Sequence, residues 1–374
     1  MMEQPSILFT MLAFVVVLGP LIFFHELGHY LVARAFGVKC DVFSIGFGKE
    51  LFGWNDKRGM RWKVAALPLG GYVKFAGDAD AASRPDTEAA DDNPAHFQNK
   101  PVWQRFLIVL AGPATNFLLA IAIFAAFFLA YGQSVPSDRQ FGEVMPGSTA
   151  EAVGLEPGDR IVSIAGRETP DMDAIMRTVI LRPGEEVLFR YEREGRIIER
   201  RGTIAAVPQE DRYGKSHVIG RIGVSAALPE RAPLGPIAAV GAGVERTWEM
   251  LGWMIDGIGR ILFGNLSVKE IGGPIKMAQV TGQQAQLGWV AAVELAALLS
   301  INLGFINLLP VPMLDGGHLL FYSIEAVRRR PVSERVQEWA FRGGLALLLA
   351  LILFTTLNDL SSVGVVERIE RLIG

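Results

Sequence analysis

The sequence predicts an α-helical polytopic membrane protein with about four transmembrane helices and an inserted α+β domain. Half of the 374 residues are hydrophobic and the mean hydropathy is +0.30. Several apolar stretches approach the roughly 20 residues that a helix needs to cross a bilayer. Residues 133–222 change to short alternating strands and glycine-rich turns, which is typical of a folded domain in water. The formal net charge of −3 gives no reason to expect nucleic acid as a partner.

Four hydrophobic segments are candidate transmembrane helices. They lie within residues 1–36, 105–132, 290–326 and 327–374. The first carries no charge between positions 5 and 24. It also has no basic start and no small-residue cleavage site, so we predict a retained span and not a removed signal peptide. Pro310 and Pro312 interrupt the third segment, and the fourth is continuously apolar only from about Gly343 to Leu357.

The Lys and Arg residues of the connecting loops predict the orientation of the spans, because such residues collect on the cytoplasmic side. Residues 37–104 are rich in them: Lys39, Lys49, Lys57, Arg58, Arg61, Lys63, Lys74, Arg84 and Lys100. The turn at the start of residues 327–374 carries Arg328-Arg329-Arg330 and Arg335. Both loops are therefore predicted to be cytoplasmic. Both termini, with a short tail after the fourth span, and residues 133–289 are predicted to lie outside.

Two of the connecting segments have recognisable patterns. In residues 37–104, Trp62 to Phe75 is predicted to form two strands about a Gly70-Gly71 turn, as a membrane-associated β-hairpin. Within residues 223–289, residues 234–263 are apolar enough to be mistaken for a fifth span. On a helical wheel, however, Glu245, Arg246, Glu249, Asp256 and Arg260 gather on one side, opposite Leu251, Met254, Ile255, Ile258 and Leu262. We therefore predict an amphipathic segment lying on the membrane surface.

The inserted domain, residues 133–222, has a regular order of predicted elements. They are a short helix from Ala150 ended by Gly154, a strand from Ile161 to Ile164, a helix from Met172 to Leu181, and strands Val187–Tyr191 and Ile197–Ile204 about Glu194-Gly195. This pattern resembles a PDZ domain of the bacterial protease-associated type. PDZ domains bind extended peptides by strand addition. The alternative is a β-rich module that only spaces two spans.

The first span contains the sequence His25-Glu26-Leu27-Gly28-His29. Ionisable residues are costly inside a membrane, so by default they indicate a functional site. His25 and His29 lie about 40° apart on one helix face, separated by one turn, and two imidazoles so placed can share one ion. This is the H-E-x-x-H arrangement of zinc proteases, in which the glutamate is the general base. The alternative is polar packing inside a helix bundle.

A third metal ligand is available in the third span. Asp315 follows the broken apolar run that begins at Asn307, and it is again an acid in an apolar setting. A catalytic zinc site takes three protein ligands and keeps a fourth position open. Under the predicted orientation the first and third spans run in the same direction, so Asp315 falls at a depth similar to that of the histidines. The lone cysteine, Cys40, excludes a cysteine-based zinc site and is predicted to be incidental.

Together these motifs resemble the bacterial site-2 protease family, of the RseP-like type. The resemblance rests on His25 to His29, Gly46-Phe47-Gly48, Gly70 to Lys74, Gly112-Pro113 with Asn116, Gly142 to Gly166, and Asn302 through Gly317, which occur in family order. One departure is that the family's best-known member has two tandem PDZ domains, whereas this chain has room for one.

The resemblance implies a bound Zn²⁺ with His25, His29 and Asp315 as ligands, and Glu26 as general base and acid. It implies that the substrate is held by Asn302 and Asn307 and by an edge strand that includes Gly70, Gly71 and Tyr72. The two asparagines fit interhelical hydrogen bonding equally well.

The activity that the resemblance implies is intramembrane proteolysis in the bacterial inner membrane, in contact with membrane lipid. The substrates would be single-span proteins, such as an anti-sigma factor of the envelope stress response, first trimmed by an upstream site-1 type protease. Both chain termini and the PDZ domain would then be periplasmic. Two rivals are a non-catalytic PDZ membrane scaffold, which would be free to lose Glu26, and a metal transporter, which would need inverted repeats that are not visible.

Overall fold

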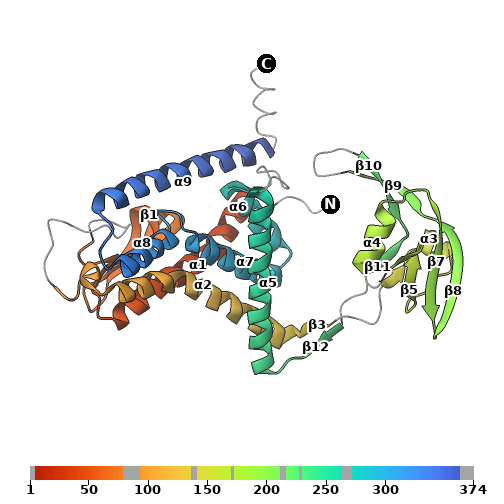
Figure 1. Cartoon of the computed structure of the whole chain (residues 1–374), viewed down its shortest axis with the longest axis horizontal. Helices are drawn as coiled ribbons and strands as arrows, with labels where there is room; N and C mark the ends of the chain where they lie inside the picture. Colours follow the sequence, from red (N-terminus) through yellow and green to blue (C-terminus); the bar gives the residue numbers. More distant parts are fainter. Residues whose placement is uncertain are drawn as a thin grey trace, which may run out of the picture. The chain divides into compact units, whose positions relative to one another are not determined.

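The computed structural model describes residues 5–78, 93–135, 141–169, 172–210, 216–226, 230–262 and 272–362. The chain forms two compact units (Figure 1), unit 1 from Met1–Ala130 with Gly235–Gly374 and unit 2 from Tyr131–Leu234. In the described part, four helices are long and apolar enough to cross a membrane: Ile7–Ala35, Val102–Tyr131, Trp289–Leu308 and Arg335–Leu360. This agrees with the prediction of about four spans.

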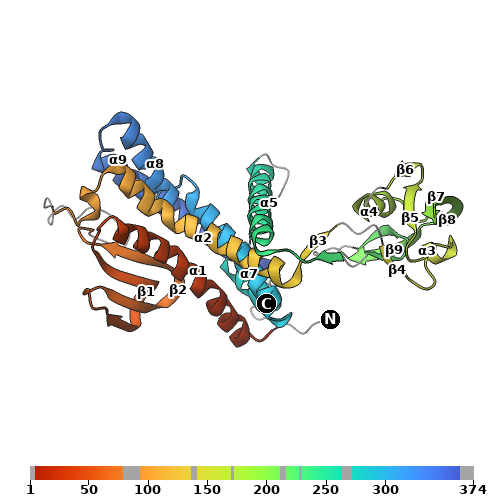
Figure 2. The same ribbon diagram turned by 90° about the horizontal axis from the view of Figure 1, so that it is seen from below.

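The first two spans are α1 (Ile7–Ala35) and α2 (Val102–Tyr131), close to their predicted limits. Helix α1 begins after Ser6, whose side chain accepts a hydrogen bond from the backbone N–H of Phe9. The two helices run side by side in both views (Figures 1 and 2). A Cβ atom added to Gly28 would lie 2.4 Å from the backbone oxygen of Ala111. Only glycine permits this approach, as is common where membrane helices meet.

The third predicted span, 290–326, is wrong as a single element. The structure has α7 (Trp289–Leu308), a loop over residues 309–314, and a separate helix α8 (Asp315–Arg328). The physical reason is Pro310, which has no N–H and forces the preceding residue, Leu309, into an extended conformation. The loop then folds tightly against α8, where a Cβ on Gly316 would lie 2.2 Å from the oxygen of Leu309.

The fourth span is longer than the apolar core from Gly343 to Leu357 suggests. Helix α9 runs over Glu334–Ser362, because it continues through polar residues at both ends. Its Asp359 accepts backbone hydrogen bonds from Gly273 and Lys276, both at 2.9 Å, and so caps the start of α6 (Pro274–Gln286). The predicted tail beyond residue 362 lies outside the described residues.

The segment between α1 and α2 folds as two long strands, β1 (Cys40–Asn55) and β2 (Arg61–Phe75). The chain reverses between them at a turn in which Asp56 Oδ1 accepts backbone hydrogen bonds at 2.8 and 3.0 Å. Gly59 supplies the left-handed backbone of this turn, with φ +83°. A short 3-10 helix, η1 (Phe97–Asn99), leads on to α2.

The prediction of two strands about Gly70-Gly71 is correct in that the chain reverses there, but it is wrong as a paired hairpin, because residues 42–45 lie between the two strands. Gly70 has φ +135° and lies in this reversal, since residues 42–45 run antiparallel to residues 71–74 but in the same direction as residues 61–64. Because β1 and β2 both bend, residues 42–45 pair with residues 71–74 along one edge and with residues 61–64 along the other. Residues 71–75 are consequently an edge segment of this sheet in the described part of the chain.

The predicted amphipathic segment, 223–289, is corrected at its start. Residues 224–226 and 230–232 are strands of unit 2, and the helical part begins with α5 (Pro236–Leu262). Helix α5 crosses α2 and does not run along it (Figures 1 and 2). At the crossing a Cβ on Gly243 would lie 2.8 Å from the oxygen of Ile121. Helix α6 packs on α1, where Gly282 faces Thr10.

Unit 2 is built from short strands and two helices. Its elements are β3 (Gln133–Val135), β4 (Phe141–Val144), α3 (Thr149–Ala152), β5 (Arg160–Ile164), β6 (Arg167–Glu168), α4 (Met172–Ile180), β7 (Glu186–Arg193), β8 (Arg196–Thr203), β9 (Ala205–Glu210), β10 (Ser216–Arg221), β11 (Val224–Ala226) and β12 (Glu230–Ala232). Four strands form a sheet in the order β6-β5-β7-β8, and β9 with β10, β4 with β11 and β3 with β12 form antiparallel pairs.

The core of unit 2 is apolar and fully enclosed, with Phe141, Ile161, Ile164 and Phe189 at 0% exposure. The predicted hairpin is present, because Glu194 and Gly195 have φ +49° and +76°, which is typical of the two-residue turns that join twisted strands. Since β3 and β12 pair at the two ends of unit 2, the unit is a single insertion that leaves and returns at one place.

Candidate metal centre

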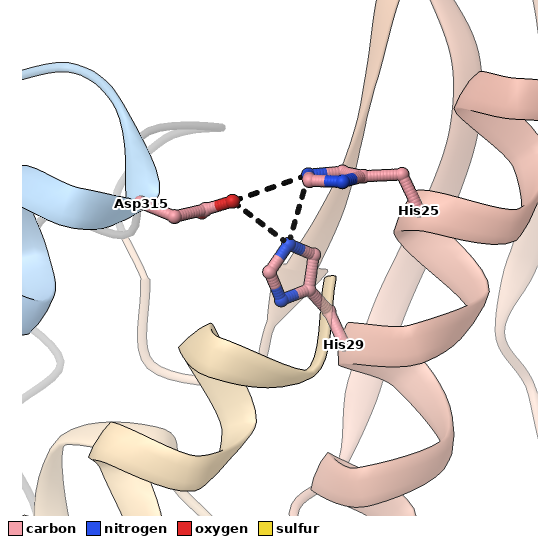
Figure 3. Close-up of side chains that lie close together, drawn as sticks. All are labelled: His25, His29 and Asp315. Carbon is pink, nitrogen blue, oxygen red and sulfur yellow. Dashed lines mark hydrogen bonds and ion pairs between the residues drawn. The ribbon is translucent and has the colours of Figure 1, made fainter. Parts of the chain in front are cut away.

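Three side chains from opposite ends of the chain converge on one point (Figure 3). His25 Nε2 lies 3.2 Å from Asp315 Oδ2, His29 Nε2 lies 3.5 Å from the same oxygen, and the two nitrogens are 3.3 Å apart. The histidines project one turn apart from α1, as predicted. Asp315 is the first residue of α8, a position where the helix dipole favours a carboxylate. The predicted ligands therefore meet.

The arrangement fits a tetrahedral zinc ion. Bonds of about 2.0–2.2 Å place the ligand atoms of such a site about 3.3–3.6 Å apart, close to the three distances above. Asp315 Oδ2 is buried and makes no hydrogen bond of acceptable geometry, although it faces two ring nitrogens. Burial of a carboxylate oxygen without a hydrogen bond costs free energy unless a bound cation compensates for it. In the described part of the chain, His25, His29 and Asp315 are the one group with metal-ligand spacing.

Helix α2 holds the outer nitrogen of each histidine ring. His29 Nδ1 lies 2.9 Å from the backbone oxygen of Ile108, so it donates a proton and leaves Nε2 free for a metal. His25 Nδ1 lies 3.1 Å from the side-chain amide of Asn116. Gly112 makes room for the ring of His29, because a Cβ there would lie 2.2 Å from Nε2.

We expect Gly112→Ala to lower zinc affinity strongly. The added methyl group would displace the His29 ring from its ligating position, whereas α2 itself favours alanine over glycine. Zinc affinity by chelator competition is the measurement. Gly19→Ala in α1 is the matched control, because a Cβ there meets nothing within 4 Å and zinc affinity should not change. Equal zinc affinity in both variants would contradict the proposed packing of Gly112 against His29.

Glu26 lies between the metal ligands and the edge of β2. Its side chain is buried. A Cβ on Gly71 would lie 2.9 Å from Glu26 Cγ, so the strand can approach the helix only because position 71 is glycine. The predicted general base therefore borders both the metal ligands and a strand edge.

The other predicted substrate-binding residues are placed less directly. Tyr72 stacks on Phe47 with ring centroids 5.9 Å apart, and Gly70 packs against the same ring. Asn302 and Asn307 are half-buried on α7, and within the described residues neither side chain makes a hydrogen bond. The structure therefore brings Gly71 to the site, while it records no contact from either asparagine to the metal ligands.

Sequence reasoning assigned no role to Asn116 or Ile108. Asn116 carries a signal in the sequence, because it is an amide in a largely apolar span and follows Gly112-Pro113 by one helical turn. Ile108 acts through its backbone oxygen, which its side chain does not reveal. Only the packing of α2 against α1 shows what Ile108 contributes.

Comparison with known proteins agrees with this chemistry. The model of peptidase family M50 matches residues 13–351. A protein of Rhizobium meliloti (strain 1021), named as a zinc metalloprotease, is 43% identical over 94% of this chain and 96% of its own length. A protein of Agrobacterium fabrum with the same designation is 41% identical over 93% and 95%. Metalloprotease MmpA of Caulobacter vibrioides is 38% identical over 95% and 96%.

The family match covers most of the chain and includes every ligand of the metal centre. The predicted resemblance to the site-2 protease family is thereby confirmed, and so is the prediction of a zinc enzyme. The chain belongs to peptidase family M50, the site-2 protease family, and is a zinc metalloprotease.

Proposed function

We propose that this protein is an intramembrane protease that cuts the transmembrane segments of single-span membrane proteins. The observation that carries the proposal is the position of the chemistry. His25, Glu26 and His29 belong to α1, a helix long and apolar enough to cross a bilayer, and all three are buried. A protease that acted on soluble chains would gain nothing from placing its general base there.

Cleavage inside a membrane requires the substrate helix to unwind, because helical carbonyls are already hydrogen-bonded and the surroundings hold no water. The edge segment 71–75 of β2 can receive the extended form by strand addition. Gly71 of this segment packs directly against the Glu26 side chain, which supports this docking site. The amides of Asn302 and Asn307 satisfy the backbone groups that unwinding frees.

The residues then have defined roles. His25, His29 and Asp315 would hold a zinc ion, which would supply Lewis-acid chemistry at the scissile carbonyl and at the attacking water. Glu26 takes a proton from the attacking water and returns it to the leaving amine. The backbone oxygen of Ile108 on α2 keeps His29 oriented.

The protein resides as a multi-pass protein in the bacterial inner membrane, with both termini in the periplasm. The Lys and Arg content of residues 37–104 and the Arg328-Arg329-Arg330 turn support a cytoplasmic location for both loops. Leu51, Phe52 and Trp54 of β1 are at least 49% exposed, which supports contact of this hairpin with membrane lipid.

Unit 2 is a single PDZ-like domain that restricts access to the site. The pairing of β3 with β12 at the two ends of the unit supports a separately folded, inserted module. Substrates with bulky outer domains are rejected until an upstream site-1 type protease has shortened them. A trimmed anti-sigma factor of the envelope stress response fits this description, and its cleavage would be regulated intramembrane proteolysis.

The proposed activity is tested with purified full-length protein and a single-span substrate in detergent or liposomes. We expect a cut within the apolar segment, mapped by mass spectrometry, and faster cleavage when a helix-breaking residue lies beside it. A non-catalytic PDZ scaffold, the rival function, would bind the substrate and leave it intact. Cuts only in loops outside the apolar segment would contradict intramembrane cleavage.

We expect removal of unit 2 to broaden the range of substrates. Residues 136–229 would be replaced by a short glycine-serine linker, which keeps the β3–β12 pair. The shortened enzyme should cut intact and trimmed substrates at similar rates, whereas the full-length enzyme should prefer the trimmed one. Zinc content of the shortened enzyme reports that unit 1 still folds. If the full-length enzyme cut both substrates equally well, the domain would be a tether and not a filter.

A further inference from the structure

Asn116 occupies a position beside the metal centre that the general mechanism does not use. It is an uncharged polar residue at 0% exposure in the middle of α2. Its backbone oxygen accepts a hydrogen bond of 2.8 Å from Ser300 of α7. Its side-chain nitrogen lies 3.1 Å from His25 Nδ1, and its side-chain oxygen is buried without a hydrogen-bond partner. An amide half satisfied at this depth is uncommon in folded proteins.

The orientation of this amide determines which nitrogen of His25 carries the ring proton. An NH₂ group that faces Nδ1 donates to it, and the proton of a neutral imidazole is then on Nε2. Nε2 is the nitrogen that faces Asp315 and His29. A protonated Nε2 cannot ligate zinc, so an amide that donates to Nδ1 is incompatible with zinc binding by His25.

Turning the amide by 180° reverses this assignment. The oxygen of Asn116 then accepts a proton from His25 Nδ1, and Nε2 is left free as a ligand. The same turn gives the oxygen the donor that it lacks. The oxygen and nitrogen of an amide are nearly identical in shape, so the turn needs no change in packing.

His29 differs from His25 in how its hydrogen-bond partner fixes the position of the ring proton. Its Nδ1 faces the backbone oxygen of Ile108, which can only accept, so the ring of His29 always presents a free Nε2. The ring of His25 faces a group that can either donate or accept. The two ligands therefore differ in how firmly their tautomers are fixed.

We infer that Asn116 is a positioning residue for zinc, whose side-chain oxygen orients His25 and selects its zinc-binding tautomer. The inference rests on the zinc assignment and not on where the substrate is cut. Zinc binding therefore tests it separately from the proposed intramembrane cleavage.

The test measures zinc affinity of the purified full-length protein by competition with a chelator. Asn116→Leu keeps the size of the side chain and removes the acceptor, and we expect affinity to fall about 10- to 100-fold. Asn116→Asp supplies a permanent acceptor, and we expect affinity at least equal to that of the wild type. Ser300→Ala removes only the contact to the Asn116 backbone and is the matched control, with affinity unchanged.

Thermal unfolding of the metal-free proteins separates this role from a purely structural one. If Asn116→Leu unfolds at the wild-type temperature and binds zinc as tightly as the wild type, the inference is overturned. If Asn116→Leu fails to fold, Asn116→Asp decides alone, because a folded aspartate variant with weakened zinc binding would overturn it. If zinc affinity fell equally in Asn116→Leu and Asn116→Asp, Asn116 would contribute only through packing.

Discussion

Glu26→Gln is expected to abolish proteolysis while zinc stays bound. Glutamine has the shape of glutamate but cannot take up a proton, so the variant loses general acid–base catalysis, which contributes about 100- to 10,000-fold. The metal ligands are His25, His29 and Asp315, and this substitution leaves all three in place. Turnover of a single-span substrate and zinc content of the same preparation are the two measurements.

The control for this variant is Glu338→Gln, the same chemical change at an exposed position in α9. That variant should cleave at the wild-type rate. Near-wild-type turnover by Glu26→Gln would show that Glu26 is not the general base. Loss of zinc along with activity would instead make Glu26 part of the metal site.

Substitution of both His25 and His29 by alanine is expected to remove the metal. The wild-type protein should carry about one equivalent of zinc, as a site with three protein ligands does. One carboxylate, that of Asp315, remains in the double variant and cannot hold zinc alone. Metal analysis of the detergent-purified protein should find almost none, and proteolysis should be lost with it.

A histidine beside the site tests whether the loss is specific. His318 is one turn beyond Asp315 on α8, and its Nδ1 lies 3.3 Å from the backbone oxygen of Leu314. His318→Gln should keep the full zinc content, because this residue lies outside the ligand group. Full zinc in the double variant of His25 and His29 would refute the site as described.

The metal centre could be predicted because its ligands are either close together in the sequence or chemically unusual for their surroundings. His25 and His29 are one turn apart, so helical geometry alone places them together. Asp315 is distant in sequence, but an acid is so costly in an apolar membrane segment that it rarely occurs there without a functional role. Four spans were also predictable, since length and hydropathy are properties of the chain itself.

The errors arose where tertiary contacts decide local structure. The reversal at Gly70-Gly71 was predictable, but the insertion of residues 42–45 between its two strands, and the approach of Gly71 to Glu26, depend on tertiary packing. The prolines of the third span indicated a break, but not that α8 would be a separate helix. The end of the inserted domain was misplaced because β11 and β12 pair with strands far away in sequence.

The order of the metal ligands along the chain has a consequence for biosynthesis. A nascent chain that has inserted α1 and α2 already presents both imidazoles and the groups of α2 that orient them. The third ligand emerges only with α8, after α1 and α2 have been synthesised. We therefore expect the metal centre to stay incomplete during synthesis until α8 brings Asp315 to the two histidines.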